Sequence, residues 1–123
     1  MGHFRRLVGW RRAFDLCVEV NAATGSFPEE ERFGLTAQLR RAAVSVASNV
    51  AEGSGRGSPA QFRHAVRIAR GSLHELATQL QLAQALGLLP AADWQRLDAS
   101  ASEVGRLLTG LLRCPPKRPT TND

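Results

Sequence analysis

The chain has 123 residues, of which 43% are hydrophobic and 22% charged, enough for one globular domain and too few for two ordinary ones. This composition excludes a disordered, collagen-like or disulfide-scaffold protein, and no apolar run reaches the roughly 18 residues of a membrane-spanning helix. The N-terminal residues lack the apolar stretch of a signal peptide, so we expect a cytoplasmic protein with no membrane partner.

The net charge is a formal +5, from sixteen Lys and Arg against eleven Asp and Glu. Lys117 is the only lysine, so nearly all cations are Arg, a residue suited to fork-shaped bonding with phosphate. A GC-rich genome would also favour Arg codons. Composition alone leaves both explanations open.

Apolar residues predict a first helix over residues 4–23. They recur at steps of three or four, at Leu7, Trp10, Phe14, Cys17 and Val20. Residues 24–26 end this helix, with a left-handed turn expected at the glycine. A short helical turn follows, opened by a proline at residue 28.

A second helix is predicted over residues 36–52, with Thr36 as its cap. Its apolar stripe consists of Leu39, Ala42 or Ala43, Val46 and Val50. The glycines in residues 53–57 predict a loop.

The third helix opens with Ser58 as cap and Pro59 at its first position, and it stops at Gly87. A fourth helix starts at Pro90. Their stripes are Phe62, Val66, Ala69, Leu73, Leu76, Leu80 and Ala83 in the third helix, and Trp94, Leu97, Ala101, Val104, Leu108 and Leu111 in the fourth. We therefore predict an all-α, antiparallel up-down-up-down four-helix bundle over residues 1–113, followed by a disordered Pro-rich tail over residues 114–123.

Catalytic and metal-binding patterns are missing from the sequence. Cys17 and Cys114 would lie about 20 Å apart along the bundle axis in this topology, too far for a disulfide. His3, His64 and His74 include no pair at ligand spacing, and no serine lies in a nucleophile motif. We expect no metal, no cofactor and no enzymatic activity.

The central segment, residues 32–74, holds seven arginines and a single acid, Glu52, a surplus of six positive charges. Three of the arginines share one face of the third helix at spacing i, i+4 and i+7. We predict phosphate contacts from Arg40, Arg41, Arg63, Arg67 and Arg70. The alternative is a solvated face, or pairing with Glu19, Glu75 or Glu103 of neighbouring helices.

A polar set in the second helix is interpreted as structural. We expect Asn49 and Glu52, with Ser45 one turn earlier, to bond backbone groups at the helix end and in the glycine loop.

These residues also carry a resemblance to a known family. The motifs are FPE at residues 27–29, ERFGLT at 31–36, QLRRA at 38–42, NVAEG at 49–53 and ARGSL at 69–73. Over residues 4–112 the chain closely resembles the four-helix-bundle proteins encoded in intervening sequences of bacterial 23S rRNA genes. The resemblance implies an up-down bundle assembled as a homopentamer. It also implies a relationship to the accessory variability protein of diversity-generating retroelements, which partners a reverse transcriptase and binds nucleic acid through a basic surface.

The sequence thus favours a non-enzymatic, oligomeric accessory protein that binds RNA or DNA through arginine–phosphate contacts. The alternative is a protein-interaction or self-assembly module with no nucleic-acid role.

Overall fold

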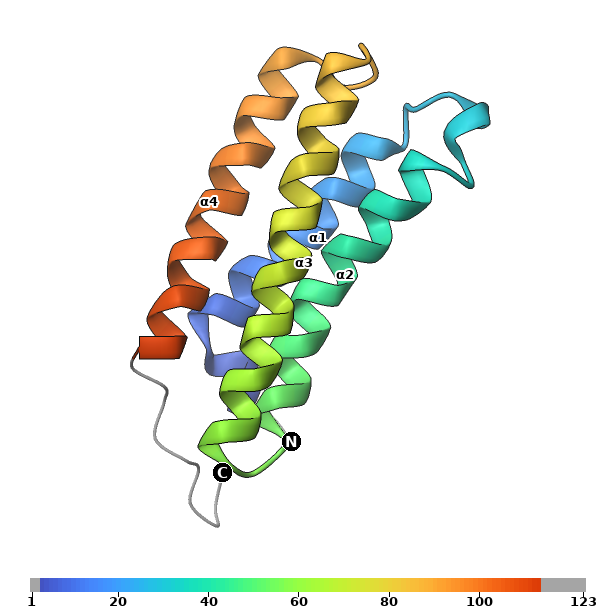
Figure 1. Cartoon of the computed structure of the whole chain (residues 1–123). Coiled ribbons are helices and arrows are strands. Elements are labelled where there is room, and N and C mark those ends of the chain that lie inside the picture. Colours follow the sequence, from blue (N-terminus) through green and yellow to red (C-terminus); the bar gives the residue numbers. More distant parts are fainter. Residues whose placement is uncertain (1–2, 114–123) are drawn as a thin grey trace.

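The computed structural model describes residues 3–113, and within them the protein is all-helical, with no strand (Figure 1). Its elements are a 3-10 turn η1 (His3–Arg6), α1 (Val8–Thr24), a 3-10 turn η2 (Glu29–Glu31), α2 (Leu35–Ser54), α3 (Pro59–Ala85) and α4 (Ala91–Arg113). The predicted all-α class and the four helices are confirmed. The predicted disorder of the tail concerns residues outside those described.

Each of the four helices packs against two others. α1 contacts α2 and α4, while α3 contacts α2 and α4, and no backbone contact joins α2 to α4 within the described chain. In Figure 1 the α1–α2 and α3–α4 connections lie at one end of the molecule, and the α2–α3 loop lies at the other. The arrangement leaves α3 with one flank against α2 and the other against α4.

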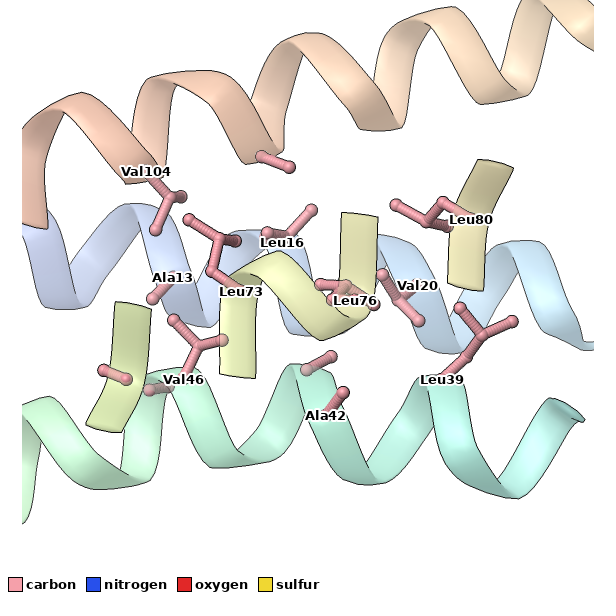
Figure 2. Close-up of a cluster of buried hydrophobic side chains, with 14 of the residues drawn as sticks. Ala13, Leu16, Val20, Leu39, Ala42, Val46, Leu73, Leu76, Leu80 and Val104 are labelled. Atoms are coloured by element: carbon pink, nitrogen blue, oxygen red, sulfur yellow. The ribbon is translucent and has the colours of Figure 1, made fainter. Parts of the chain in front are cut away.

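All four helices contribute to one hydrophobic core. Figure 2 shows Leu16, Leu39, Leu73 and Val104, one from each helix, within it. Burying such side chains stabilises the fold by about 1.5–3 kcal/mol each. The stripes predicted for the second and third helices are fully buried. In the fourth helix the stripe is buried except for its two ends, which are half-buried against the core.

The stripe predicted for the first helix is confirmed in part. Val20 is buried, and Leu7, Trp10 and Cys17 are half-buried against the core, but Phe14 is 44% exposed. The prediction missed Ala13 and Leu16, which are buried. The start of α1 lies close to α4. A Cβ on the neighbouring Gly9 would lie 3.2 Å from Leu111 Cδ1.

Several helix ends differ from the prediction. α1 starts only at Val8, after the 3-10 turn, and Gly25 keeps a right-handed conformation with φ −62°. Gly34, not Thr36, stands at the N-cap of α2, and the buried Thr36 hydroxyl has no hydrogen-bond partner in the described chain.

The two ends of α3 agree with the prediction, but the end of α2 does not. The backbone N–H of Gln61 donates to Ser58 Oγ at 3.1 Å, and Gly87 adopts a positive φ of 78° just after the helix. α2 continues two residues into the expected loop, through Gly53 to Ser54, and Gly53 packs directly against α3.

Candidate functional site

The predicted arginine face exists on α3. Arg63, Arg67 and Arg70 lie on successive turns, with Arg67 exposed and the other two half-buried. Within residues 3–113 none of the three has an ion pair or a hydrogen bond. Pairing with Glu103, one of the alternatives, does not occur, because that carboxylate lies 3.5 Å from Arg12 Nε.

A groove of about 510 Å³ runs beside this face, between α3 and α4. Arg70 and His74 line it from α3, while Arg106 and Arg113 line it from α4. The last two arginines are seven residues apart on α4 and therefore share a face. The sequence analysis did not predict Arg106 and Arg113 because it considered the basic segment at residues 32–74 alone. Their i, i+7 spacing on the fourth helix was the pattern that indicated a shared face.

Two glycines help to keep the groove open because they carry no side chain. Gly105 and Gly110 both line it. A Cβ on Gly110 would meet no atom within 4 Å, and one on Gly105 would come no closer than 3.4 Å to Leu73 Cδ2. The glycines leave space between two cationic helix faces.

The lining of the groove contains donors and no carboxylate. Besides the cations, Ser102 and Thr109 present hydroxyls that have no hydrogen-bond partner within the described residues. The nearest acids in sequence are Glu75, next to His74, and Glu103, next to Ser102, and neither lines the groove. The Glu103 carboxylate is paired with Arg12 instead. The charge of the arginines is therefore not neutralised by the groove itself.

Elsewhere on the molecule, arginines are paired. Five surface ion pairs are Arg11–Asp15, Arg12–Glu103, Arg32–Glu29, Arg56–Glu52 and Arg96–Asp93. Among the described residues, the arginines with no carboxylate, hydrogen-bond or aromatic partner are Arg41, Arg63, Arg67, Arg70, Arg106 and Arg113. Five of these six lie on α3 and α4.

Of the five predicted phosphate contacts only Arg70 lines the groove, and two of the others, Arg40 and Arg41, lie on α2. Arg40 is engaged with the C-terminal end of α1: its Nε donates to Thr24 Oγ1 at 2.8 Å and its Nη2 donates to the Asn21 carbonyl at 3.3 Å. A cation at a helix C-terminus satisfies orphan carbonyls and the helix dipole. Arg41 is exposed, but it stands on α2, which has no backbone contact with α4.

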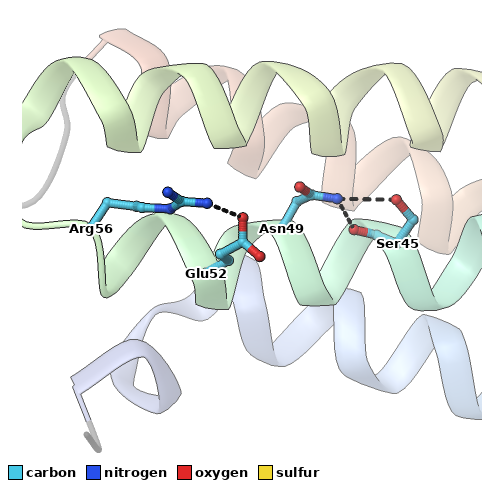
Figure 3. Close-up of polar contacts among 4 residues, drawn as sticks. All are labelled: Ser45, Asn49, Glu52 and Arg56. Carbon is cyan, nitrogen blue, oxygen red and sulfur yellow. Dashed lines mark hydrogen bonds and ion pairs between the residues drawn. The ribbon is translucent and has the colours of Figure 1, made fainter.

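The predicted capping role of the α2 polar residues is corrected by the structure (Figure 3). Asn49 Nδ2 donates to the carbonyl of Ser45 at 2.8 Å and to its Oγ at 3.1 Å, one turn back from the helix end. Ser45 Oγ lies 2.8 Å from Ser72 Oγ on α3. Glu52 Oε1 accepts from Arg56 Nη2 at 2.7 Å, a side-chain contact with the loop. Glu52 lies in the last turn of α2, where the open backbone groups are carbonyls. An ionised carboxylate only accepts hydrogen bonds, so it pairs with the guanidinium instead.

Other reactive groups are sparse in the described chain. Cys17 is a free, half-buried thiol, and burial raises its pKa above the usual value. No group of three or more His, Cys, Asp and Glu residues within 3–113 is arranged to hold a metal ion. No helix in that range is long and apolar enough to span a membrane.

The fold and the groove define the class: a small all-α protein of four packed helices with an arginine-lined groove between the last two. The chain belongs to the 23S rRNA-intervening sequence protein family, whose profile matches residues 5–110.

A solved structure has the same fold. It is the crystal structure of a protein of unknown function from the S23 ribosomal protein family of Bacteroides thetaiotaomicron, 20% identical in sequence, with a TM-score of 0.79. The match covers 86% of this chain and 96% of that chain, and at this identity it informs on fold alone. No curated protein matches the chain.

Proposed function

We propose that this protein is a non-enzymatic, oligomeric accessory protein that binds nucleic acid through phosphate contacts from α3 and α4. The observation that carries the proposal is the clustering of unpaired arginines on these two helices. Like charges one turn apart repel by a few tenths of a kcal/mol, and an anionic partner would relieve that repulsion.

The proposal replaces two of the arginines expected from sequence. Arg40 is occupied at the end of α1, and Arg41 stands on α2, away from α4. The proposed contacts are Arg63, Arg67, Arg70, Arg106 and Arg113. Because the family is named for a 23S rRNA-intervening sequence, RNA is the first nucleic acid to test.

A salt series tests the phosphate contacts. With about five contacts, affinity should fall about 100- to 500-fold between 50 and 200 mM salt, from a slope of about −3.5 to −4.5 on logarithmic axes. Changing Arg63, Arg67 and Arg70 together to Glu should abolish binding.

The matched control for this triple variant changes Arg11, Arg32 and Arg96 to Glu. It alters net charge by the same amount at exposed sites that already carry ion pairs. Nucleic-acid affinity that is equal in the two triple variants would contradict the proposal.

We further propose that the helices run antiparallel, up-down-up-down, and that the chain assembles as a homopentamer like the family it resembles. Exposed apolar side chains on two packed helices support assembly: Phe14 is 44% and Val18 55% exposed on α1, and Val44 is 49% exposed on α2. Phe14 and Val18 are four residues apart on α1 and share a face, and contiguous exposed apolar patches are typical of protein–protein contacts.

Light scattering tests the assembly. Phe14→Glu should dissociate the oligomer, whereas Ile68→Glu on α3, at a site that is also 44% exposed, should leave it intact. A wild-type protein that scatters as a monomer would contradict this part of the proposal.

A relationship to the accessory variability protein of diversity-generating retroelements is part of the proposal, with a reverse transcriptase as the partner in that case. A neighbouring retroelement in the genome would support it.

The second candidate is a protein-interaction or self-assembly module with no nucleic-acid role, which the same exposed apolar residues favour. It requires that the purified protein carry no nucleic acid and assemble without any ligand. The ratio of absorbance at 260 and 280 nm after purification distinguishes the two candidates.

A further inference from the structure

The arginines of α3 and α4 form two different arrangements. Arg63 and Arg67 follow the surface of one helix and do not line the groove. Arg70, Arg106 and Arg113 approach a common space from two helices. A row of cations suits the repeating charges of a polymer backbone, but a convergent set suits one compact, highly charged group.

The donors around the groove match a terminal phosphate better than an internal one. A phosphomonoester carries a charge of about −1.5 to −2 near pH 7 and offers three strong acceptor oxygens. An internal phosphodiester carries a single negative charge. Three guanidinium groups, each able to bond two oxygens, surround the space together with the hydroxyls of Ser102 and Thr109.

We propose that the α3–α4 groove is a binding site for one phosphomonoester group, held by Arg70, Arg106 and Arg113. The expected ligand is the phosphorylated end of a nucleic-acid strand. This choice of ligand rests on the proposed function, whereas the site itself rests on the residues that line the groove. The groove volume of about 510 Å³ leaves room for the phosphate and part of the nucleotide that carries it.

The first experiment compares two RNA oligonucleotides of one sequence, bearing either a 5′-phosphate or a 5′-hydroxyl, by fluorescence anisotropy with the full chain. The wild type should bind the phosphorylated strand about tenfold more tightly, the effect of losing charge-assisted hydrogen bonds. A nucleoside 5′-monophosphate should compete for this preference because it carries the same phosphomonoester group. Comparing its own affinity with that of the phosphorylated strand separates a free nucleotide from a strand end as ligand.

Three variants locate the effect. Arg106→Gln should remove the preference for the phosphorylated strand, and Arg41→Gln, an equal charge change at another exposed, unpaired arginine, should preserve it. Gly110→Leu keeps every charge but fills the groove, so it too should remove the preference. Circular dichroism establishes that each variant is folded.

The outcomes separate this inference from the proposed function. Equal, tight binding of both strands by the wild type overturns the groove site and leaves nucleic-acid binding in place. Binding of the nucleoside monophosphate in an Arg106-dependent way, with no binding of either strand, supports the groove and overturns the proposed function. A wild type that binds neither strand nor monophosphate overturns both.

Discussion

α3 meets its two neighbours in opposite ways. On the α2 flank, Ala65, Ser72 and Gln79 recur every seven residues, and each faces a similar residue of α2: Gly53, Ser45 and Gln38 in turn. On the α4 flank, α3 presents Arg70 and His74 to the groove, and the facing helix presents two arginines, two glycines and two hydroxyls. We call the neutral, tightly packed side of α3 that faces α2 the closed flank. We call the cationic side that faces α4 and lines the groove the open flank.

The difference teaches where a binding site can arise in a fold this small. Along α2 the side chains satisfy each other, through a 2.8 Å contact between Ser45 Oγ and Ser72 Oγ and a 3.4 Å bond from Gln79 Nε2 to Gln38 Oε1. The buried Gln79 Oε1 has no partner among the described residues, but it is an acceptor and offers no hydrogen to an anion. Along α4 the donors stay unpaired within the described chain, so only that flank can respond to an anion.

The largest expected effect on stability comes from a substitution that disrupts packing on the closed flank. A Cβ at Gly53 would lie 2.7 Å from Ala65 Cβ, so Gly53→Ala forces the helices apart and should lower the free energy of unfolding by about 1–3 kcal/mol. Gly110→Ala on the open flank meets no atom and should raise it by about 0.5–1 kcal/mol through helix propensity. Urea denaturation measures both. Changes of the same sign would show that the two flanks do not differ in packing.

The next prediction concerns an arginine that serves the fold. Arg40→Gln removes the charge-assisted hydrogen bonds to Thr24 Oγ1 and the Asn21 carbonyl, and should cost about 1.5 kcal/mol of stability. Arg41→Gln, at the next residue but unpaired, should change stability by less than about 0.5 kcal/mol. Thermal unfolding of the two variants, with nucleic-acid affinity measured alongside, decides the assignment. A loss of affinity without loss of stability in Arg40→Gln would return that residue to the binding surface.

Sequence periodicity was sufficient for the α2, α3 and α4 cores because their large apolar residues occur only on one face. It was less accurate for α1, where two apolar stripes lie side by side. The large Phe14 is exposed and the small Ala13 is buried, while Trp10 is half-buried against the core. Helix spacing correctly grouped the arginines of α3. It could not show that Arg40 reaches back sixteen residues to Thr24, since that contact depends on how α1 and α2 cross.

A smaller effect on stability is expected from the hydroxyl pair between Ser45 and Ser72 on the closed flank. Ser72→Ala removes the hydroxyl pair with Ser45 and should cost about 1 kcal/mol. A double-mutant cycle with Ser45→Ala isolates the pair, and we expect a coupling energy of about 0.5–1 kcal/mol. Additive single effects would mean that the two hydroxyls are independently solvated. Gly71→Ala, next to Ser72 with no atom near its Cβ position, serves as the control and should not destabilise.

The smallest expected effect is an increase in stability, and it tests whether the open flank serves binding and not packing. Arg106 contributes repulsion against Arg70 and Arg113 and makes no bond within the described chain, so Arg106→Gln should stabilise the protein by about 0.3 kcal/mol at low salt. Because salt screens such repulsion, the gain should vanish near 0.5 M, where the Debye length is only about 4 Å. Thermal unfolding at two salt concentrations measures this gain in stability. The control is Arg12→Gln, which breaks the pair with Glu103 and should not stabilise the protein.

Destabilisation by Arg106→Gln would mean that the guanidinium is held by the fold. Stabilisation would mean that the chain keeps three uncompensated cations at a cost to its own stability, which is typical of residues retained for binding.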